Sequence, residues 1–224
     1  MDYENNFFKI LIIFKEERKM AVVSRRLVKP YPGKTELVMS RVKRFSDIAV
    51  EGGAKSRISK AIGGEMNGTI MLTNVYSSLT EATKSFESYM QNPKMAELMK
   101  ERENDQSADL IGPEVFRTVY GAPSPSHNVI YLREYEINRN SVPQALEIFA
   151  EANEEFKDED TKLLALLPLI ADKMNSLYAI YYFSSIASMG EIVERVGLSE
   201  NFQKLVNKGN KIGTLTASNI FVSV

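Results

Sequence analysis

Two arginines, Arg26 and Arg133, stand in the middle of segments rich in valine, leucine and isoleucine. A guanidinium group binds a carboxylate or an enolate through parallel N–H donors, and a buried guanidinium needs such an acceptor. Strand alternation places Tyr131, Arg133 and Tyr135 on one face, with phenol groups on both sides of the charge. We therefore predict that Arg26, Arg133 and these tyrosines bind a small acidic or aromatic ligand.

Both arginines also have a structural explanation. Each could pair with Glu65, Glu114 or Glu134, or extend its charged end to water at the rim of a barrel. In the structural case, replacing Arg133 lowers only the stability of the protein. In the functional case, the variant stays folded and loses its ligand.

His127 is the single histidine of the 224-residue chain, so any imidazole chemistry must use it. It follows a linker of proline and serine at residues 121–126 and begins a strand pattern. A histidine in such a place is most often hydrogen-bonded or solvated, and no second histidine exists for a paired metal site. We keep His127 as a candidate ligand-binding residue and predict no metal site.

Composition excludes several classes of function. The chain has no cysteine, which removes disulfides, thiolate nucleophiles and thiolate metal sites. A net charge of −1 without a basic run argues against nucleic acid as a partner. The Gly52-Gly53 and Gly63-Gly64 pairs lack a nucleotide fingerprint, and the acidic run at residues 154–160 lacks the spacing of a calcium loop. We predict no cofactor.

Residues 1–19 differ from the rest of the chain. Their apolar run, Phe7 to Phe14, is too short for a membrane helix, and acidic residues precede it where a secretion signal needs basic ones. We predict a cytoplasmic protein with no membrane partner, and we treat residues 1–19 as an N-terminal extension. A start-site artefact and a genuine accessory element both remain open.

The rest of the chain repeats one order of elements. Residues 20–121 predict strand, helix, two strands joined by a type I′ turn at Asn67-Gly68, a helix and a strand. Residues 127–224 predict the same order. A shift of 107 residues aligns the two halves without a gap, including Val22 with Val129 and Arg26 with Arg133. We predict two repeats that share one topology.

The sheet that such a βαββαβ unit forms has helices on one face and an open second face. Residues 163–167 and 70–72 are apolar on both sides of their strands, which a solvated face does not tolerate. We expect each open face to pack against the other half of the same chain, across the short linker.

Four short segments carry a resemblance to a known superfamily. They are the strand-to-helix steps Ser77-Ser78-Leu79 and Ser184-Ser185-Ile186, and the helix breaks Asn92-Pro93-Lys94-Met95 and Ser199-Glu200-Asn201-Phe202. With them, residues 20–224 resemble the dimeric α+β barrel superfamily, in particular its two-repeat NIPSNAP or EthD-like members. The resemblance implies an α+β fold of two tandem ferredoxin-like repeats that form a barrel within one chain.

The resemblance implies a fold more firmly than an activity. The superfamily includes cofactor-independent monooxygenases, lactone isomerases, and haem-containing or haem-degrading enzymes. Haem-containing members take their axial histidine from a helical region, unlike His127, and haem degraders use an inner histidine and a tryptophan. This chain has no tryptophan, so we predict that it does not use haem.

Two functional hypotheses follow. In the first, the protein binds a small aromatic or acidic metabolite in a cleft between a sheet and its helices, with cofactor-independent oxygenase or isomerase activity. In the second, it is a non-catalytic binding or assembly module. The barrel closes within one chain in both cases, and a homodimer is expected through the outer helices or the Phe7 to Phe14 segment.

Overall fold

The computed structural model describes residues 20–224, so the predicted N-terminal extension and its Phe7 to Phe14 segment lie outside the described residues. The first half consists of β1 (Val22–Pro30), α2 (Thr35–Glu51), β2 (Lys55–Gly63), β3 (Ile70–Tyr76), α3 (Leu79–Met90), α4 (Pro93–Asn104) and β4 (Ala108–Gly121). Their order is the one predicted for residues 20–121, with the second helix divided into α3 and α4.

The second half repeats this order. It consists of β5 (Val129–Ile137), α5 (Val142–Glu155), β6 (Thr161–Ile170), β7 (Ser176–Phe183), α6 (Ile186–Ile192), α7 (Glu200–Gly209) and β8 (Gly213–Ser223). A 3₁₀ turn at Arg139–Ser141 precedes α5, and a π-helical segment at Val193–Gly197 joins α6 to α7. The helix break expected at Ser199-Glu200-Asn201-Phe202 is present, because α7 begins anew after Ser199.

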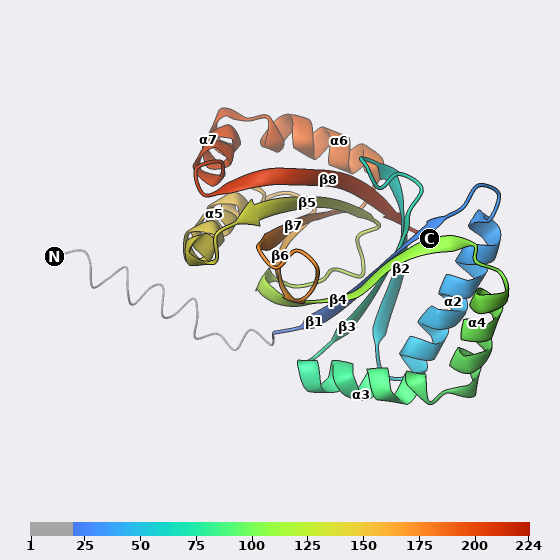
Figure 1. Cartoon of the computed structure of the whole chain (residues 1–224). Helices are drawn as coiled ribbons and strands as arrows, with labels where there is room; N and C mark the ends of the chain where they lie inside the picture. The colour runs from blue at the N-terminus through green and yellow to red at the C-terminus, as the bar shows by residue number, and fades with distance from the viewer. Residues whose placement is uncertain (1–19) are drawn as a thin grey trace.

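The eight strands form one closed antiparallel barrel in the order β1-β3-β2-β8-β5-β7-β6-β4 (Figure 1). The β2–β8 and β4–β6 pairs join the two halves, so the barrel closes within the chain as expected. The pairing register also repeats, because Val22 lies opposite Tyr76 and Val129 lies opposite Phe183, each 107 residues further on. Both halves therefore present equivalent positions to the barrel.

Local side-chain chemistry explains where four helices begin. Ser78, Ser185 and Ser199 each accept a hydrogen bond from the backbone N–H three residues later, at 3.0 to 3.2 Å. Asn92 accepts one from the N–H two residues later, at 2.9 Å, and Pro93 follows it at the first helical position. Such caps satisfy otherwise unpaired N–H groups at a helix start. These predicted caps are confirmed.

The loop between β2 and β3 corrects one prediction. A type I′ turn needs a positive φ at both central residues, whereas only Gly68 has one here, at +83°. The Thr69 N–H donates to the Met66 carbonyl at 2.8 Å, so the four-residue turn starts at Met66. The loop from Gly64 to Thr69 is longer than a two-residue hairpin, and a longer loop has no need of the primed turn.

The helices lie outside the barrel, with α2, α3 and α4 over the first half and α5, α6 and α7 over the second (Figure 1). Alternation divides β7 between the two layers. Tyr178 and Tyr182 pack inside the barrel, while Tyr181 and Phe183 pack under the helices. Every residue of β7 is buried, which explains its apolar sequence.

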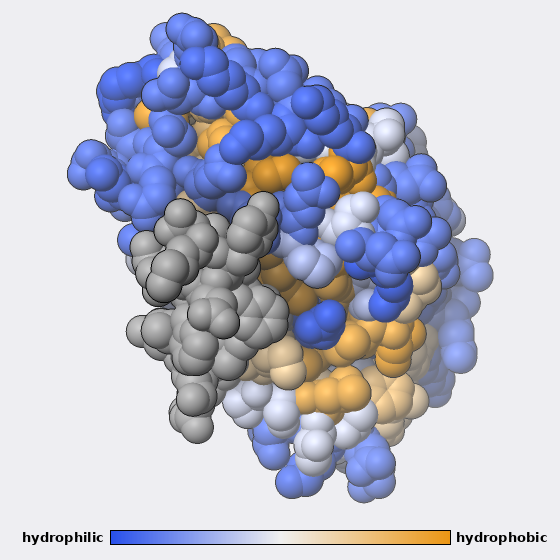
Figure 2. Space-filling model, turned by 90° about the vertical axis from the view of Figure 1, so that its left-hand side faces the viewer, coloured by the Kyte–Doolittle hydropathy of each residue, from blue (hydrophilic) through white to orange (hydrophobic). Residues whose placement is uncertain are grey.

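One face of the molecule shows apolar residues gathered between polar regions (Figure 2). No helix within residues 20–224 is long and apolar enough to cross a membrane.

Candidate functional site

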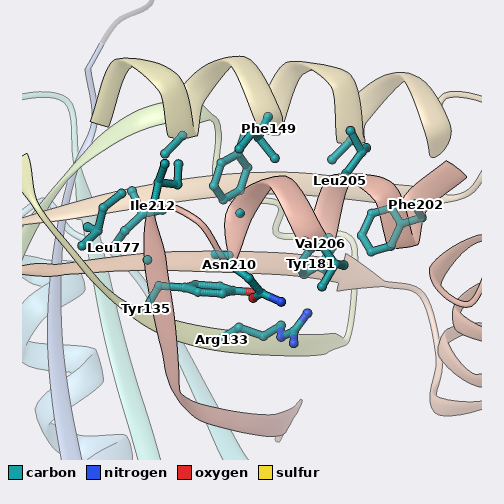
Figure 3. Close-up of a pocket in the computed structure, with 17 residues that line it drawn as sticks. Arg133, Tyr135, Phe149, Leu177, Tyr181, Phe202, Leu205, Val206, Asn210 and Ile212 are labelled. Atoms are coloured by element: carbon teal, nitrogen blue, oxygen red, sulfur yellow. The ribbon is translucent and has the colours of Figure 1, made fainter. Parts of the chain in front are cut away.

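A cleft lies between the outer face of the second-half sheet and helices α5 and α7 (Figure 3). It encloses a volume of about 80 Å³ and opens to solvent. Most lining residues are apolar, among them Phe149 and Leu205. The polar groups are Arg133, Tyr135, Tyr181 and Asn210. An apolar cleft with a few polar groups is the usual form of a small-molecule site.

Strand alternation places Arg133 in this cleft. Within β5, Leu132 and Glu134 turn into the barrel and are buried, whereas Tyr131, Arg133 and Tyr135 face the helices. Since β5 is a central strand, paired with β7 and β8, its backbone holds these side chains in a fixed order. The predicted shared face of Tyr131, Arg133 and Tyr135 is present.

The Arg133 guanidinium has no ion-pair partner among the described residues. Its carbon lies 5.9 Å from the ring centroid of Tyr131 and 5.6 Å from that of Tyr135. Its Nε is buried and makes no hydrogen bond. A half-buried charge with an unused donor is unfavourable unless an acceptor arrives, so the geometry leaves room for an anionic group.

The tyrosines of the cleft are neutral hydrogen-bonding groups. Burial raises the pKa of Tyr135, although the neighbouring Arg133 opposes the shift. Burial also raises the pKa of Tyr181. The Tyr131 hydroxyl accepts a hydrogen bond from Ser218 Oγ at 3.1 Å. The phenols of Tyr135 and Tyr181, which line the cleft, can donate hydrogen bonds to an oxygen of a ligand, but they are poor proton acceptors near neutral pH.

Arg26 lines an equivalent but separate cleft of about 120 Å³ under the first-half helices. Its Nη2 donates to the Tyr89 hydroxyl at 2.8 Å, and its guanidinium stacks on Phe45 at 4.5 Å from the centroid. The structure therefore does not bring Arg26 and Arg133 together. Arg26 has internal partners for its charge, and Arg133 has only the faces of two rings.

Two of the glutamates that could have paired with Arg26 or Arg133 form ion pairs with other cationic side chains. Glu114 pairs with Arg25 at 2.6 Å, and Glu134 pairs with Lys173 at 2.9 Å. Both carboxylates are buried, and their strand positions turn them away from the helix-facing arginines. Pairing of Arg26 or Arg133 with Glu114 or Glu134 is therefore wrong.

His127 lies in the linker and is not among the residues that line the cleft. Its ring is buried, with Nδ1 at 2.7 Å from Ser124 Oγ and Nε2 at 2.9 Å from Asp160 Oδ1. Serine and aspartate on the two ring nitrogens resemble a serine-hydrolase triad, although in such a triad the serine bonds to Nε2 and the carboxylate to Nδ1, the reverse of the arrangement here. However, the Asp160 side chain is 66% exposed, so water screens the carboxylate that would orient the imidazole. Both ring nitrogens are thus occupied in holding the linker.

Sequence reasoning missed Asn210 and the cleft-facing role of Tyr181. The aromatic run at residues 181–183 signalled a buried cluster, and only the fold shows that Tyr181 turns to the cleft. Asn210 caps the end of α7, and no pattern in the sequence marks it as a site residue.

Comparison with solved structures shows the fold. No protein-family model and no curated protein sequence matches this chain. An anthrone oxidase-like protein aligns with a TM-score of 0.62 at 10% identity, covering 93% of this chain and 92% of the other. A candidate monooxygenase from Fusobacterium nucleatum aligns with a TM-score of 0.61 at 10% identity, covering 91% and 92%. A haem-binding protein from Thermus thermophilus aligns with a TM-score of 0.52 at 9% identity, covering 91% of each chain.

These neighbours share an α+β architecture, so the predicted dimeric α+β barrel fold is confirmed. At such low identity the likeness concerns the fold alone.

The residues of the cleft do not fit haem. Haem iron takes an axial histidine, cysteine, methionine or tyrosinate, and the lining residues include no histidine, cysteine or methionine. The two lining tyrosines, Tyr135 and Tyr181, have raised pKa values, which disfavours the phenolate that iron requires. The cleft can instead hold a small organic anion by charge and hydrogen bonds.

Proposed function

We propose that the protein binds a small acidic or aromatic metabolite in the cleft under α5 and α7. The single observation that carries this proposal is the Arg133 guanidinium, which faces the cleft without an acceptor. A carboxylate or enolate beside it gains a charge-assisted hydrogen bond. Tyr131 and Tyr135 flank the charge, and the apolar residues of α5 and α7 suit the body of the ligand.

The activity that fits this site is cofactor-independent oxygenation or isomerisation. A cation aimed at an enolate oxygen stabilises the negative charge that forms when a substrate loses a proton next to a carbonyl. The lining residues include no histidine, carboxylate or lysine to take that proton. The substrate must therefore be acidic enough at that carbon to ionise in water, as an anthrone is. The neighbours described as a candidate monooxygenase and an anthrone oxidase-like protein support this choice.

The same lack of a base among the lining residues favours a second function, a non-catalytic binding module. In that case Arg133 and the tyrosines hold a carboxylate and promote no reaction. His127, which binds the linker, has a positioning role in both cases.

Calorimetric titration with benzoate, salicylate and acetoacetate tests the binding proposal. We expect at least one of these acids to bind, and Arg133→Met to weaken it about tenfold or more through the lost charge-assisted hydrogen bond. Arg26→Met is the matched control, because Arg26 occupies the equivalent position in the other half, and it should leave the affinity unchanged. If Arg133→Met leaves the binding of all three acids unchanged, the proposal is refuted. Oxygen uptake with anthrone, present in wild type and lost in Arg133→Met, separates the enzyme from the binding module.

We further propose that the two halves, 20–121 and 127–224, are tandem ferredoxin-like repeats related to the NIPSNAP or EthD-like proteins. Their equal element order and equal strand register support this. We also propose a cytoplasmic homodimer that associates through the outer helices or residues 1–19. Light scattering of the full chain and of a chain without residues 1–19 tests the assembly.

A further inference from the structure

The barrel itself encloses a second cavity, with a volume of about 330 Å³. Strands of both halves and the linker residues 122–125 line it. An apolar cavity of about 150 Å³ is enough to bind benzene, so this space suits a molecule of roughly two rings or a medium-length chain. It is larger than the enclosed part of the cleft under α5 and α7, from which the wall of the barrel separates it.

The charged residues that line the cavity, Arg25, Lys55 and Arg57, all come from the first half. The first half contributes polar side chains at three positions, and the second half has branched apolar ones at the equivalent positions 107 residues on. These pairs are Arg25 with Leu132, Arg57 with Leu164, and Thr73 with Ile180. Arginine is rarely buried unless its charge is paired, so packing alone does not explain an arginine in this wall that lacks a carboxylate partner. The two halves therefore differ in the way that an amphipathic ligand requires.

The two arginines differ in how their charge is balanced. Arg25 pairs with Glu114 at 2.6 Å and is neutralised within the wall. Arg57 has no carboxylate partner among the described residues, and neutral oxygens accept its hydrogen bonds. Its Nε donates to Ser223 Oγ at 2.8 Å, its Nη1 to the Ser124 carbonyl at 2.9 Å, and its Nη2 to the carbonyl of His127.

A guanidinium has five N–H donors, so these three bonds leave two donors of Arg57 for a ligand. Arg57 is half-buried, and this burial lowers its pKa. The exposed Lys55 also lines the cavity and adds a second positive charge near its mouth. The positive charge on this wall thus exceeds the negative charge.

We propose that the barrel interior is a second ligand site, for a carboxylic acid with an apolar body. The carboxylate binds Arg57, and the body packs on Leu132, Leu164 and Ile180. An acid fits better than a neutral molecule because it balances the Arg57 charge, and a charge-assisted hydrogen bond is about twice as strong as a neutral one. The site is independent of the cleft that contains Arg133.

Two pairs of probes test this site and distinguish the ligand body. Isothermal titration compares 2-naphthoate with 2-naphthalenemethanol, and octanoate with octanol. We expect any acid that binds to have an affinity at least tenfold higher than that of the matching alcohol. Binding of naphthoate alone identifies an aromatic acid, and binding of octanoate alone identifies a fatty acid. If neither acid binds when it is present at about 1 mM, the proposal is wrong.

Variants locate the bound acid. Val75→Phe fills the cavity, and an aromatic residue, Tyr182, already stands at the equivalent position of the second half. It should abolish acid binding while the circular dichroism spectrum and melting temperature stay near wild type. Arg57→Gln should weaken binding of the acid and leave binding of the alcohol unchanged. Ser223→Ala removes one contact of Arg57 but keeps its charge, so it should bind as wild type does.

Arg133→Met separates this proposal from the function proposed for the cleft. It should not change binding of the acids to the barrel, whatever it does to ligands of the cleft. If Arg133→Met abolishes binding of naphthoate and octanoate while Val75→Phe does not, both acids occupy the cleft and the barrel site is wrong. Equal affinities for acid and alcohol also overturn the role of Arg57.

Discussion

Breaking the buried ion pair between Arg25 and Glu114 should cause a large, measurable loss of stability. The Arg25 Nη2 lies 2.6 Å from Glu114 Oε2, and the side chains are only 7% and 11% exposed. The guanidinium also stacks between Phe116 and Tyr178, at 4.8 and 4.7 Å from the ring centroids. Removal of one charge from such a pair leaves the other buried without a counter-charge.

Glu114→Gln keeps the shape of the side chain and removes its charge. Breaking a buried pair typically costs about 3–5 kcal/mol, and we expect about 3 kcal/mol because the glutamine oxygen still accepts one hydrogen bond. For a chain of this size each kcal/mol lowers the melting temperature by about 2–4 °C, so the expected fall is about 6–12 °C. Urea unfolding followed by circular dichroism measures the free energy directly.

The double variant Arg25→Leu with Glu114→Leu is the matched control. It removes both charges, and leucine already stands at position 132, which is equivalent to Arg25. We expect its free energy of unfolding to lie within about 1.5 kcal/mol of wild type. A loss below about 1 kcal/mol for Glu114→Gln would mean that water reaches the pair. A double variant less stable than Glu114→Gln would refute the account in which the unpaired charge causes the loss.

Three further outcomes are expected. Burial raises the pKa of Tyr181 above that of the unfolded chain, so the contribution of Tyr181 to the free energy of unfolding should be constant below about pH 10 and fall as the pH rises further; Tyr181→Phe should reduce that fall in alkaline urea titrations. Ser78→Ala removes a helix cap and should cost about 1 kcal/mol in the same assay, whereas Ser78→Asp, which keeps an acceptor, should cost less. Gly64→Ala places a Cβ 2.3 Å from the Ser218 carbonyl oxygen at a φ of +86° and should lower the melting temperature more than Gly68→Ala, where φ is +83° and nothing lies within 4 Å. An equal effect of the two glycine variants would mean that the loop can move away from Ser218.

Local chemistry made much of the fold predictable. Helix starts follow from short polar side chains and Pro93, because these groups satisfy the first N–H groups of a helix within a few residues. Strand β5 is confirmed at residues 129–137, where alternation places Tyr131, Arg133 and Tyr135 on one face. The turn at Asn67-Gly68 was mispredicted, because the same dipeptide also fits longer loops and the chain on either side decides which forms.

The candidate sites divide in a similar way. Alternation alone separates Arg25 from Arg26, but it does not say which of the two faces the barrel and which faces the helices. The face that becomes the barrel interior depends on how the sheets of the two halves join, and the β2–β8 and β4–β6 pairs make that join. Arg133 could be predicted as a cleft residue, whereas its lack of a partner depends on where Glu114 and Glu134 turn.

The sequence by itself determined the order of elements, the helix caps and the two faces of each strand, since these depend on groups a few residues apart. Only the tertiary structure decided that Arg26 has partners and Arg133 has none, and that Arg57 and Ile180 line one cavity. These contacts join residues more than sixty positions apart. The closure of the barrel brings these residues together, and no local pattern in the chain encodes that closure.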